Sequence, residues 1–478
     1  MASTRSSRQR RSGTPAPAVP PGELIVVTVS TGPEITPIAL RENRSVRGRV
    51  DELLPATAHL VPIFGPDNRL AARLADTPQA PVAGEYLSYY SVHGELGDLG
   101  ELAHRLRADD TVAAAYVKPA AEPPLAPLAE NIVAARAPAV TPDFRARQAY
   151  LDAAPHGIDA VWAHGQPGGL GTGVRVIDIE GAWQFTHEDL RQNQGGIIGG
   201  TASADLGWRN HGTAVAGEIS GDLNAVGVTG IAPEAHIRAI SIFGIGSAAA
   251  IRSAADALNP GDIVLIELHR PGPRFDYQGT PDQRGYIAVE WWPDDFAAIR
   301  YAVSRGIIVV EAAGNGAENL DDAVYDTRPG DFPTTWRNPF RANDSGAIVV
   351  GAGAPPPGLH GRDHGPARSR LDFSNHGARL DAQGWGREVT TTGYGDLQGG
   401  PDEDLWYTDE FSGTSSASPI VVGAIAAYQG IRGSARATPD QVRSLLRATG
   451  SPQTAAAGRP VTQRIGNLPD LRAMTAKG

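Results

Sequence analysis

The fold is decided by residues 173–179, which read Gly-Val-Arg-Val-Ile-Asp-Ile (GVRVIDI). Similar short apolar runs recur further along the chain: HIRAISIF at 236–243, DIVLIEL at 262–268, GIIVVEA at 306–312 and GAIVVGA at 346–352. Runs without polar alternation are typical of strands buried on both faces. Helical stretches separate them, so we predict one α/β domain over residues 145–478. We expect a doubly wound, mostly parallel sheet with helices on both faces.

A smaller unit is expected before this domain, over residues 22–118. Strand-like runs at 23–30, 85–92 and 111–117 accompany a helical stretch at 96–107 in which leucines recur at helical spacing. Strand, helix and strand within about 100 residues indicate a small α+β unit of ferredoxin-like type. Residues 119–144 are rich in Pro and Ala, which favours an exposed linker.

Composition and the N-terminus restrict the cellular setting. Residues 1–21 carry four arginines and no acid, as a disordered tail does, and no apolar export segment follows them. No apolar run approaches the ~20 residues of a membrane span, so we expect a cytoplasmic protein without a membrane partner, although non-standard export stays open. The net charge of −11 argues against nucleic-acid binding. Oligomeric state is left open.

The absence of cysteine limits the chemistry. With no cysteine among 478 residues, a disulfide scaffold, a thiolate metal site and a cysteine nucleophile are all excluded. Only two lysines occur, Lys118 and Lys477. Catalysis therefore has to rest on hydroxyl, imidazole, carboxyl and amide groups.

One glycine pattern suggests an oxidoreductase. Gly244-Ile245-Gly246 follows an apolar run and precedes a helical stretch, and Glu267 lies about twenty residues further on. This fits the Rossmann pattern in which glycines admit the pyrophosphate of NAD(P) and an acid binds the ribose. Tight turns between strands and helices in parallel sheets also favour glycine, and the fingerprint usually follows the first strand of its unit. We therefore rank NAD(P) binding below the alternative that follows.

Three segments point to nucleophilic catalysis instead. Asp178 lies near the carboxyl end of a predicted strand, where α/β sheets build their sites. His211 is flanked by small residues in NHGTAVAG, and Ser415 lies in SGTSSASP, at the expected start of a helix that runs to Gln429. Free N–H groups at a helix start can stabilise an oxyanion. Each residue alone has an ordinary structural explanation, since Asp and Ser cap turns and helices and a lone His is more often structural.

These segments together resemble the three catalytic blocks of the subtilisin-like serine proteases, the subtilases. The blocks are VRVIDIEGAWQFTHEDL, HGTAVAG and FSGTSSASPIVVGAIA, and they occur in the family's order. The resemblance covers roughly residues 145–472 and implies a subtilisin-like fold. It also implies that the unit at 22–118 is a pro-domain that occupies the cleft of a zymogen until it is cleaved.

The resemblance assigns roles to four residues. It implies that Ser415 attacks a peptide carbonyl, that His211 is the general base and that Asp178 orients the imidazole. The block AAGNG implies that the Asn315 side chain stabilises the oxyanion, together with the backbone N–H of Ser415. The substrate would be a peptide or protein, and the chemistry needs no cofactor.

The sequence departs from the family pattern at three glutamates. Glu180 is a second carboxyl group near Asp178, which could tune the imidazole or face solvent. Glu267 and Leu268 stand in the segment that usually pairs with substrate, and Glu311 precedes the block that contains Gly314. We name these as substrate-binding candidates: Glu267, Leu268, Glu311 and Gly314. If both glutamates reach the specificity pocket, they favour a basic residue before the scissile bond; if they are buried, they share a proton or a structural network.

The family often carries a structural calcium. Asp189 in HEDL and Asn224 in LNAVGVTGIAP match ligand positions, together with the carbonyl groups of Val226 and Val228. Oxygen donors suit calcium, although both segments also have a packing role. A serine endopeptidase made as a zymogen is the function we predict. A catalytically silent relative that only binds, and the less favoured Rossmann oxidoreductase, are the alternatives.

Overall fold

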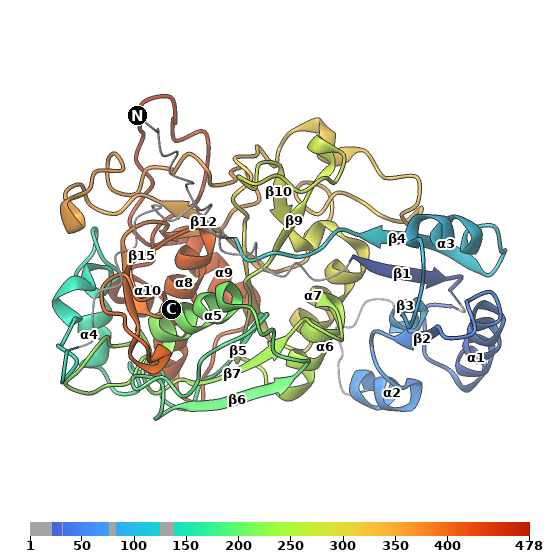
Figure 1. Ribbon diagram of the computed structural model, residues 1–478, viewed down its shortest axis with the longest axis horizontal. Helices are drawn as coiled ribbons and strands as arrows, with labels where there is room; N and C mark the ends of the chain where they lie inside the picture. The colour runs from blue at the N-terminus through green and yellow to red at the C-terminus, as the bar shows by residue number, and fades with distance from the viewer. Residues whose placement is uncertain (1–21, 31, 76–82, 125–137) are drawn as a thin grey trace, which may run out of the picture.

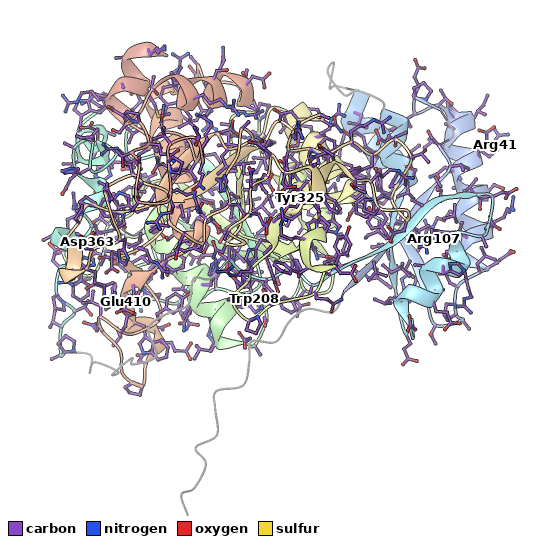
Figure 2. The ribbon with its side chains drawn as sticks, turned by 90° about the horizontal axis from the view of Figure 1, so that it is seen from above. Arg41, Arg107, Trp208, Tyr325, Asp363 and Glu410 are labelled. Atoms are coloured by element: carbon purple, nitrogen blue, oxygen red, sulfur yellow. The ribbon has the colours of Figure 1, made fainter. Side chains whose placement is uncertain are left out.

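The computed structural model describes residues 22–30, 32–75, 83–124 and 138–478. It shows a smaller N-terminal unit beside a larger α/β unit (Figure 1). Seen from above, Arg41 and Arg107 of the smaller unit lie at one end of the molecule, and Asp363 and Glu410 lie at the other (Figure 2). The predicted tail at 1–21 and residues 125–137 of the predicted linker lie outside the described residues.

The N-terminal unit is built on a four-stranded antiparallel sheet in the order β2-β3-β1-β4. Its helices and strands are β1 (Glu23–Thr28), α1 (Pro37–Asp51), β2 (His59–Pro62), α2 (Asp67–Ala75), β3 (Tyr89–His93), α3 (Leu99–Leu106) and β4 (Val112–Lys118). The predicted strands at 23–30 and 111–117 and the 96–107 helix are confirmed within a few residues. The run at 85–92 is strand only from Tyr89, because Ala83–Ser88 form a 3-10 helix. Helix α1 was missed because its polar sequence leaves only Ala39, Asn43 and Val50 buried.

Both faces of this small sheet are covered. Alternate residues such as Leu24 and Val26 pack in a core shared with α3, whereas Ile25 and Val27 belong to a core shared with the larger unit. At that boundary the ring of Phe64 lies 5.6 Å from the ring of Tyr301, between centroids. The period-2 alternation of strand side chains thus attaches the N-terminal unit to the helices of the larger one.

The larger unit contains a seven-stranded sheet in the order β13-β12-β11-β8-β5-β7-β6, and each neighbouring pair is parallel. Its strands are β5 (Arg175–Glu180), β6 (Gln194–Gly199), β7 (His236–Ser241), β8 (Ile263–Ile266), β11 (Ile308–Ala312), β12 (Ile348–Gly353) and β13 (Ala382–Trp385). Two antiparallel pairs stand apart, β9 (His269–Pro271) with β10 (Tyr286–Ala288), and β14 (Val389–Thr392) with β15 (Tyr407–Phe411). The predicted parallel α/β architecture is confirmed.

Helices cover both faces of the seven-stranded sheet (Figure 1). They are α4 (Ala160–His164), α5 (Leu206–Ser220), α6 (Ser247–Ala257), α7 (Pro293–Ser304), α8 (Thr414–Arg432), α9 (Pro439–Ala448) and α10 (Leu471–Lys477). Strand residues such as Val176 and Val310 share a core with α5 and α8, whereas Ile177 and Val309 share the other core with α6 and α7. Because side chains alternate along a strand, these two cores show which layer of helices each strand residue faces. Within the described part of the chain, none of the helices has the length and apolar character that crossing a membrane requires.

Candidate active site

Ser415 lies in the first turn of α8, fully buried. Its hydroxyl donates a hydrogen bond of 2.8 Å to the backbone carbonyl of Pro124, a residue almost 300 positions earlier. Gly413, just before the helix, has φ +115°, and a Cβ atom there would lie 2.1 Å from the same carbonyl oxygen. A side chain at position 413 would therefore push the bound carbonyl away from Ser415.

The side-chain amide of Asn315 lies near the Ser415 hydroxyl. It follows β11, and its Oδ1 accepts hydrogen bonds from the backbone N–H and the hydroxyl of Thr414, at 2.9 and 3.0 Å. These contacts orient the side chain and leave Nδ2 buried, without a hydrogen-bond partner among the residues that the structure describes. A Cβ on Gly413 would lie 3.2 Å from this Nδ2 and 3.0 Å from Ser415 Oγ. The unpaired amide donor and the hydroxyl thus lie together beside the Pro124 carbonyl.

His211 is held in the second turn of α5, which begins five residues before it. The helix packs closely on β14, because a Cβ atom on Gly217 would lie 2.4 Å from Thr392 Oγ1. The hydroxyls of Thr391 and Thr392 donate to helix carbonyls at 2.7 and 2.6 Å. The small residues around His211 therefore let α5 pack closely on β14.

Glu180, and not Asp178, is the acid that contacts the imidazole. Nδ1 of His211 lies 2.7 Å from Glu180 Oε2, and both side chains are fully buried. Asp178 instead accepts a hydrogen bond of 2.7 Å from the indole N–H of Trp183. The prediction that Asp178 orients His211 is wrong in its geometry. Both acids face α5, since they are two residues apart on β5, but only Glu180 stands at the carboxyl end of the strand.

Burial sets the protonation of this pair. It lowers the pKa of His211 to about 3, against a smaller opposing effect of Asp178. Burial also raises the pKa of Glu180 and of Asp178 well above their usual range. This low pKa favours the neutral imidazole, and the 2.7 Å contact with Glu180 suits the tautomer whose proton lies on Nδ1. Nε2, which has no partner among the described residues, is then free to accept a proton.

His269 lies between Asn315 and His211. The sequence alone assigns this residue no role. Its Nδ1 accepts a hydrogen bond of 3.3 Å from the backbone N–H of Asn315. Burial lowers its pKa well below the usual value, and the nearby His211 lowers it further. Its position in the segment expected to pair with substrate is the signal that could have found it.

Residues 119–124 pair with the larger unit along a path that ends at Ser415. Glu122 and His269 form an antiparallel bridge, with their backbone N–H and carbonyl groups exchanging two hydrogen bonds of 3.1 Å. The amide of Gln283 donates to the Pro123 carbonyl at 3.0 Å, and the Tyr286 hydroxyl donates to Glu122 at 2.7 Å. The prediction of an exposed linker is wrong for this stretch. Instead, Pro123 and Pro124 are buried, because the larger unit pairs with their backbone.

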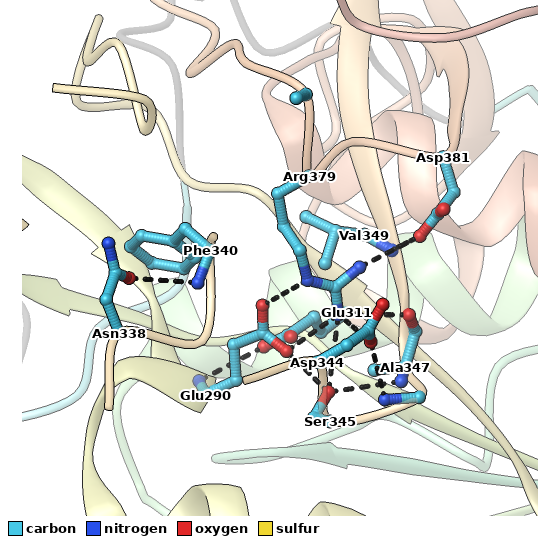
Figure 3. Close-up of polar contacts among 12 residues, drawn as sticks. Glu290, Glu311, Asn338, Phe340, Asp344, Ser345, Ala347, Val349, Arg379 and Asp381 are labelled. Atoms are coloured by element: carbon cyan, nitrogen blue, oxygen red, sulfur yellow. Dashed lines mark hydrogen bonds and ion pairs between the residues drawn. The ribbon is translucent and has the colours of Figure 1, made fainter. Parts of the chain in front are cut away.

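The candidate pocket glutamates lie on opposite faces of the sheet. Glu267 faces α5; its carboxyl oxygens have no hydrogen-bond partner in the described chain, and burial together with Glu180 raises its pKa. Glu311 faces α7, where its carboxyl group accepts from the backbone N–H of Glu290 at 3.4 Å. Glu290 in turn pairs with Arg379 at 2.7 Å in the network of Figure 3. The hypothesis of a shared acidic specificity pocket is wrong, because the alternation of strand side chains separates the two acids.

The other two pocket candidates have packing roles. Leu268 is fully buried in the core shared with α6 and α7. Gly314 has φ +96°, and its backbone N–H donates to the Thr414 hydroxyl at 3.2 Å. It thereby connects the segment of Asn315 to the start of α8.

The predicted calcium ligands come together as a hydrogen-bonded cluster. Asp189 accepts from the Asn224 amide at 2.7 Å and from the backbone N–H of Val228 at 2.6 Å. Asn224 uses its oxygen to accept from the N–H of Val226, also at 2.7 Å. Calcium needs oxygen lone pairs, whereas here N–H donors occupy both Asp189 oxygens and the Asn224 oxygen. These contacts hold the loop by hydrogen bonds without a metal ion, and each oxygen keeps a second lone pair, so calcium binding stays a prediction.

We expect stability that does not depend on calcium. Because the N–H donors already satisfy Asp189, adding EDTA should leave the thermal unfolding temperature unchanged within about 1 °C, since a ligand that binds the folded state shifts it by mass action. The measurement is calorimetry with EDTA and with excess calcium, and Asp189→Ala serves as the positive control for loss of the cluster. A calcium-dependent rise of several degrees would contradict this prediction.

The glycine turn of the Rossmann hypothesis is covered by the N-terminal unit. Gly246 has φ +80°, and a Cβ atom there would lie 2.3 Å from Glu23 Oε2. Glu23 therefore occupies the space beside the turn that a dinucleotide would need.

Comparison with known proteins agrees with this fold. The model of the subtilase family (peptidase S8) matches residues 169–467. Subtilisin BL of Lederbergia lenta is 30% identical over 276 residues, which cover 56% of this chain and 80% of that protein. Subtilisin E of Bacillus subtilis (strain 168) is 26% identical over 284 residues, or 58% of this chain and 61% of that protein.

Among solved structures, the chain is similar to fervidolysin from Fervidobacterium pennivorans, described as a keratinolytic enzyme related to subtilisin. The TM-score is 0.57 at 18% sequence identity, a likeness of fold. The match covers 98% of this chain but spans only 62% of fervidolysin, less than two thirds of its length. The family model covers more than half of the chain and includes Glu180, His211, Asn315 and Ser415, and the chain therefore belongs to the subtilase family.

Proposed function

We propose that this protein is a serine endopeptidase in which Ser415, His211 and Glu180 form the catalytic triad. The observation that carries the proposal is the Pro124 carbonyl, 2.8 Å from the Ser415 hydroxyl and beside the unpaired Nδ2 of Asn315. A nucleophile and an unused hydrogen-bond donor beside one peptide carbonyl are the parts that acyl transfer needs.

The reaction follows from these positions. Ser415 Oγ attacks the substrate carbonyl carbon while His211 Nε2 takes the hydroxyl proton, and Glu180 holds the imidazole by Nδ1. The carbonyl oxygen becomes an oxyanion, which Asn315 Nδ2 and the backbone N–H of Ser415 stabilise. His211 then gives its proton to the leaving amine, and water repeats the cycle on the acyl-enzyme.

We further propose that the chain is made as a zymogen. In the precursor, residues 119–124 lie in the groove as a substrate would, and Ser415 donates to Pro124 instead of to His211. The peptide bond that follows the Pro124 carbonyl is then the one presented to the nucleophile. Departure of this segment frees the groove for other peptides.

Covalent labelling tests the proposal. We expect a fluorophosphonate probe to label the wild-type chain and to leave Ser415→Ala unlabelled, because only an activated serine attacks the probe phosphorus. Ser418→Ala is the matched control: it removes a hydroxyl from the same helix that only donates to the Thr414 carbonyl, at 2.8 Å. The readout is in-gel fluorescence together with the N-terminal sequence of any processed product.

The outcomes separate the candidate functions. Labelling that requires Ser415 supports the peptidase, and an N-terminus after Pro124 that is absent from Ser415→Ala supports self-processing. Equal labelling of wild type and Ser415→Ala, with the groove opened by limited proteolysis, would contradict the proposal. It would favour the alternative, a member of the family that binds peptides without cleaving them.

A further inference from the structure

A buried cationic side chain from the N-terminal unit is seated in the larger unit. Lys118, the last residue of β4, is fully buried. Its ammonium group donates to Asp294 Oδ2 at 2.5 Å, to Asp295 Oδ2 at 3.1 Å and to Ser247 Oγ at 2.9 Å. A buried charge is tolerated only where it is paired and hydrogen-bonded. These three partners belong to the larger unit, and Glu23 of the N-terminal unit also pairs with the ammonium group, at 3.3 Å.

The cation and the scissile position lie on one extended stretch of chain. From Lys118 the backbone continues to Pro124, whose carbonyl accepts from Ser415. Between them, the Pro119 carbonyl accepts from the guanidinium of Arg270, and Glu122 pairs with His269. Counting Pro124 as the first residue before the cleaved bond, Lys118 is the seventh. Its pocket is therefore a distal part of the same peptide-binding groove.

The pocket retains its acidic character without the N-terminal unit. Asp294 and Asp295 occupy the first turn of α7, where a helix favours negative charge. Arg270 approaches Asp295 at 3.8 Å and also contacts Ser247, at 2.8 Å. Asp294, in contrast, has its side-chain contacts with Lys118 and the Tyr116 hydroxyl, both from the N-terminal unit. Arg270 also pairs with Glu23 of the N-terminal unit. If that unit departs, Arg270 loses Glu23 and remains, among the described residues, as the one cation against the two carboxyl groups of Asp294 and Asp295, which leaves Asp294 facing the empty position.

We propose that Asp294, with Asp295 and Ser247, forms a subsite for a basic side chain, Lys or Arg, seven residues before the cleaved bond. The inference rests on the proposed peptidase function and adds a substrate class to it: extended peptides with a cationic residue at that position. In the precursor, Lys118 fills the subsite and anchors the segment that blocks the groove.

A pair of peptides tests the subsite. Two internally quenched peptides carry the sequence of residues 116–130, one with Lys at the position of Lys118 and the other with Gln. Rates are divided by the concentration of Ser415 that a fluorophosphonate titrates in the preparation of the full chain. We expect kcat/KM to be about tenfold higher for the Lys peptide, since a charge-assisted contact to carboxylates is lost with Gln.

Variants assign the preference to the pocket. We expect Asp294→Asn with Asp295→Asn to bring the ratio of the two rates close to one. Asp282→Asn is the control: Asp282 is an exposed acid in the loop between β9 and β10 whose side chain pairs with Arg284, and the ratio should stay near ten. The ratio of kcat/KM for the two peptides is also measured on the wild type, so the subsite can be tested even if the double variant fails to fold.

The results distinguish this inference from the function it rests on. Cleavage of both peptides at equal rates would overturn the subsite and leave the peptidase intact. A preference for Lys that survives in the double variant would also overturn it. Absence of any Ser415-dependent cleavage or labelling after limited proteolysis has removed the blocking segment would overturn the peptidase and the subsite together.

Discussion

Replacing Glu180 with Gln is expected to lower kcat by about 10⁴-fold, with a much smaller change in KM. Glu180 Oε2 lies 2.7 Å from His211 Nδ1, and a carboxylate that accepts the Nδ1 proton leaves Nε2 to take the proton of Ser415. Gln can instead donate its amide to Nδ1, which favours the wrong tautomer, and loss of the orienting acid costs serine proteases about this much. The measurement is steady-state hydrolysis of a chromogenic peptide, on enzyme titrated at Ser415.

Asp178→Asn is the matched control for this variant. Asn keeps an oxygen that accepts from the Trp183 indole N–H, and Asp178 makes no hydrogen bond to His211. We therefore expect kcat to stay within about tenfold of wild type, the difference coming from the lost charge near the imidazole. The reverse ranking, with Asp178→Asn the more damaged, would return the role of orienting acid to Asp178.

Removing the Asn315 amide is expected to lower kcat by about 10²–10³-fold, with KM nearly unchanged. The interaction forms with the oxyanion of the transition state and not with the ground-state substrate, so its loss appears in kcat. Two variants separate the hydrogen bond that Nδ2 donates to the oxyanion from the contacts that Oδ1 makes with Thr414. Asn315→Asp keeps an oxygen for the Thr414 N–H and hydroxyl but loses the donor, whereas Asn315→Ala loses both.

The comparison of the two Asn315 variants decides the role of this residue. Both should lose kcat, and only Asn315→Ala should also lose the contact that orients the start of α8. Thermal unfolding of each variant reports that structural part separately. If Asn315→Asp kept kcat within about threefold of wild type, the oxyanion would be stabilised by other donors and the assignment would fail.

The site could be predicted from the sequence only in part. Ser415 was placed correctly at a helix start, because Gly413, Thr414 and the following apolar run are a local signal for the end of a loop and the beginning of a helix. His211 was recognised by its small neighbours, which pack α5 on β14. The prediction chose the wrong acid. Asp178 and Glu180 are two residues apart and so lie on the same face of β5, and the sequence does not show which of them is level with His211 on α5.

Two further features required the tertiary structure. The segment 119–124 has the composition of an exposed linker, yet its backbone pairs with His269 and its Pro124 carbonyl meets Ser415. Glu267 and Glu311 both end apolar strand runs, yet they face opposite layers of helices. No nearby residue in the sequence reveals either outcome.

The sequence by itself determined the buried parallel strands, the helices that follow them and the chemical groups available for catalysis. These depend on interactions between residues close in the chain: apolar runs, turn glycines and helix starts. Only the tertiary structure decided that Glu180 meets His211, that Pro124 meets Ser415 and that Lys118 meets Asp294. Each of these contacts joins residues separated by 31 to 291 positions, so it depends on how whole elements pack.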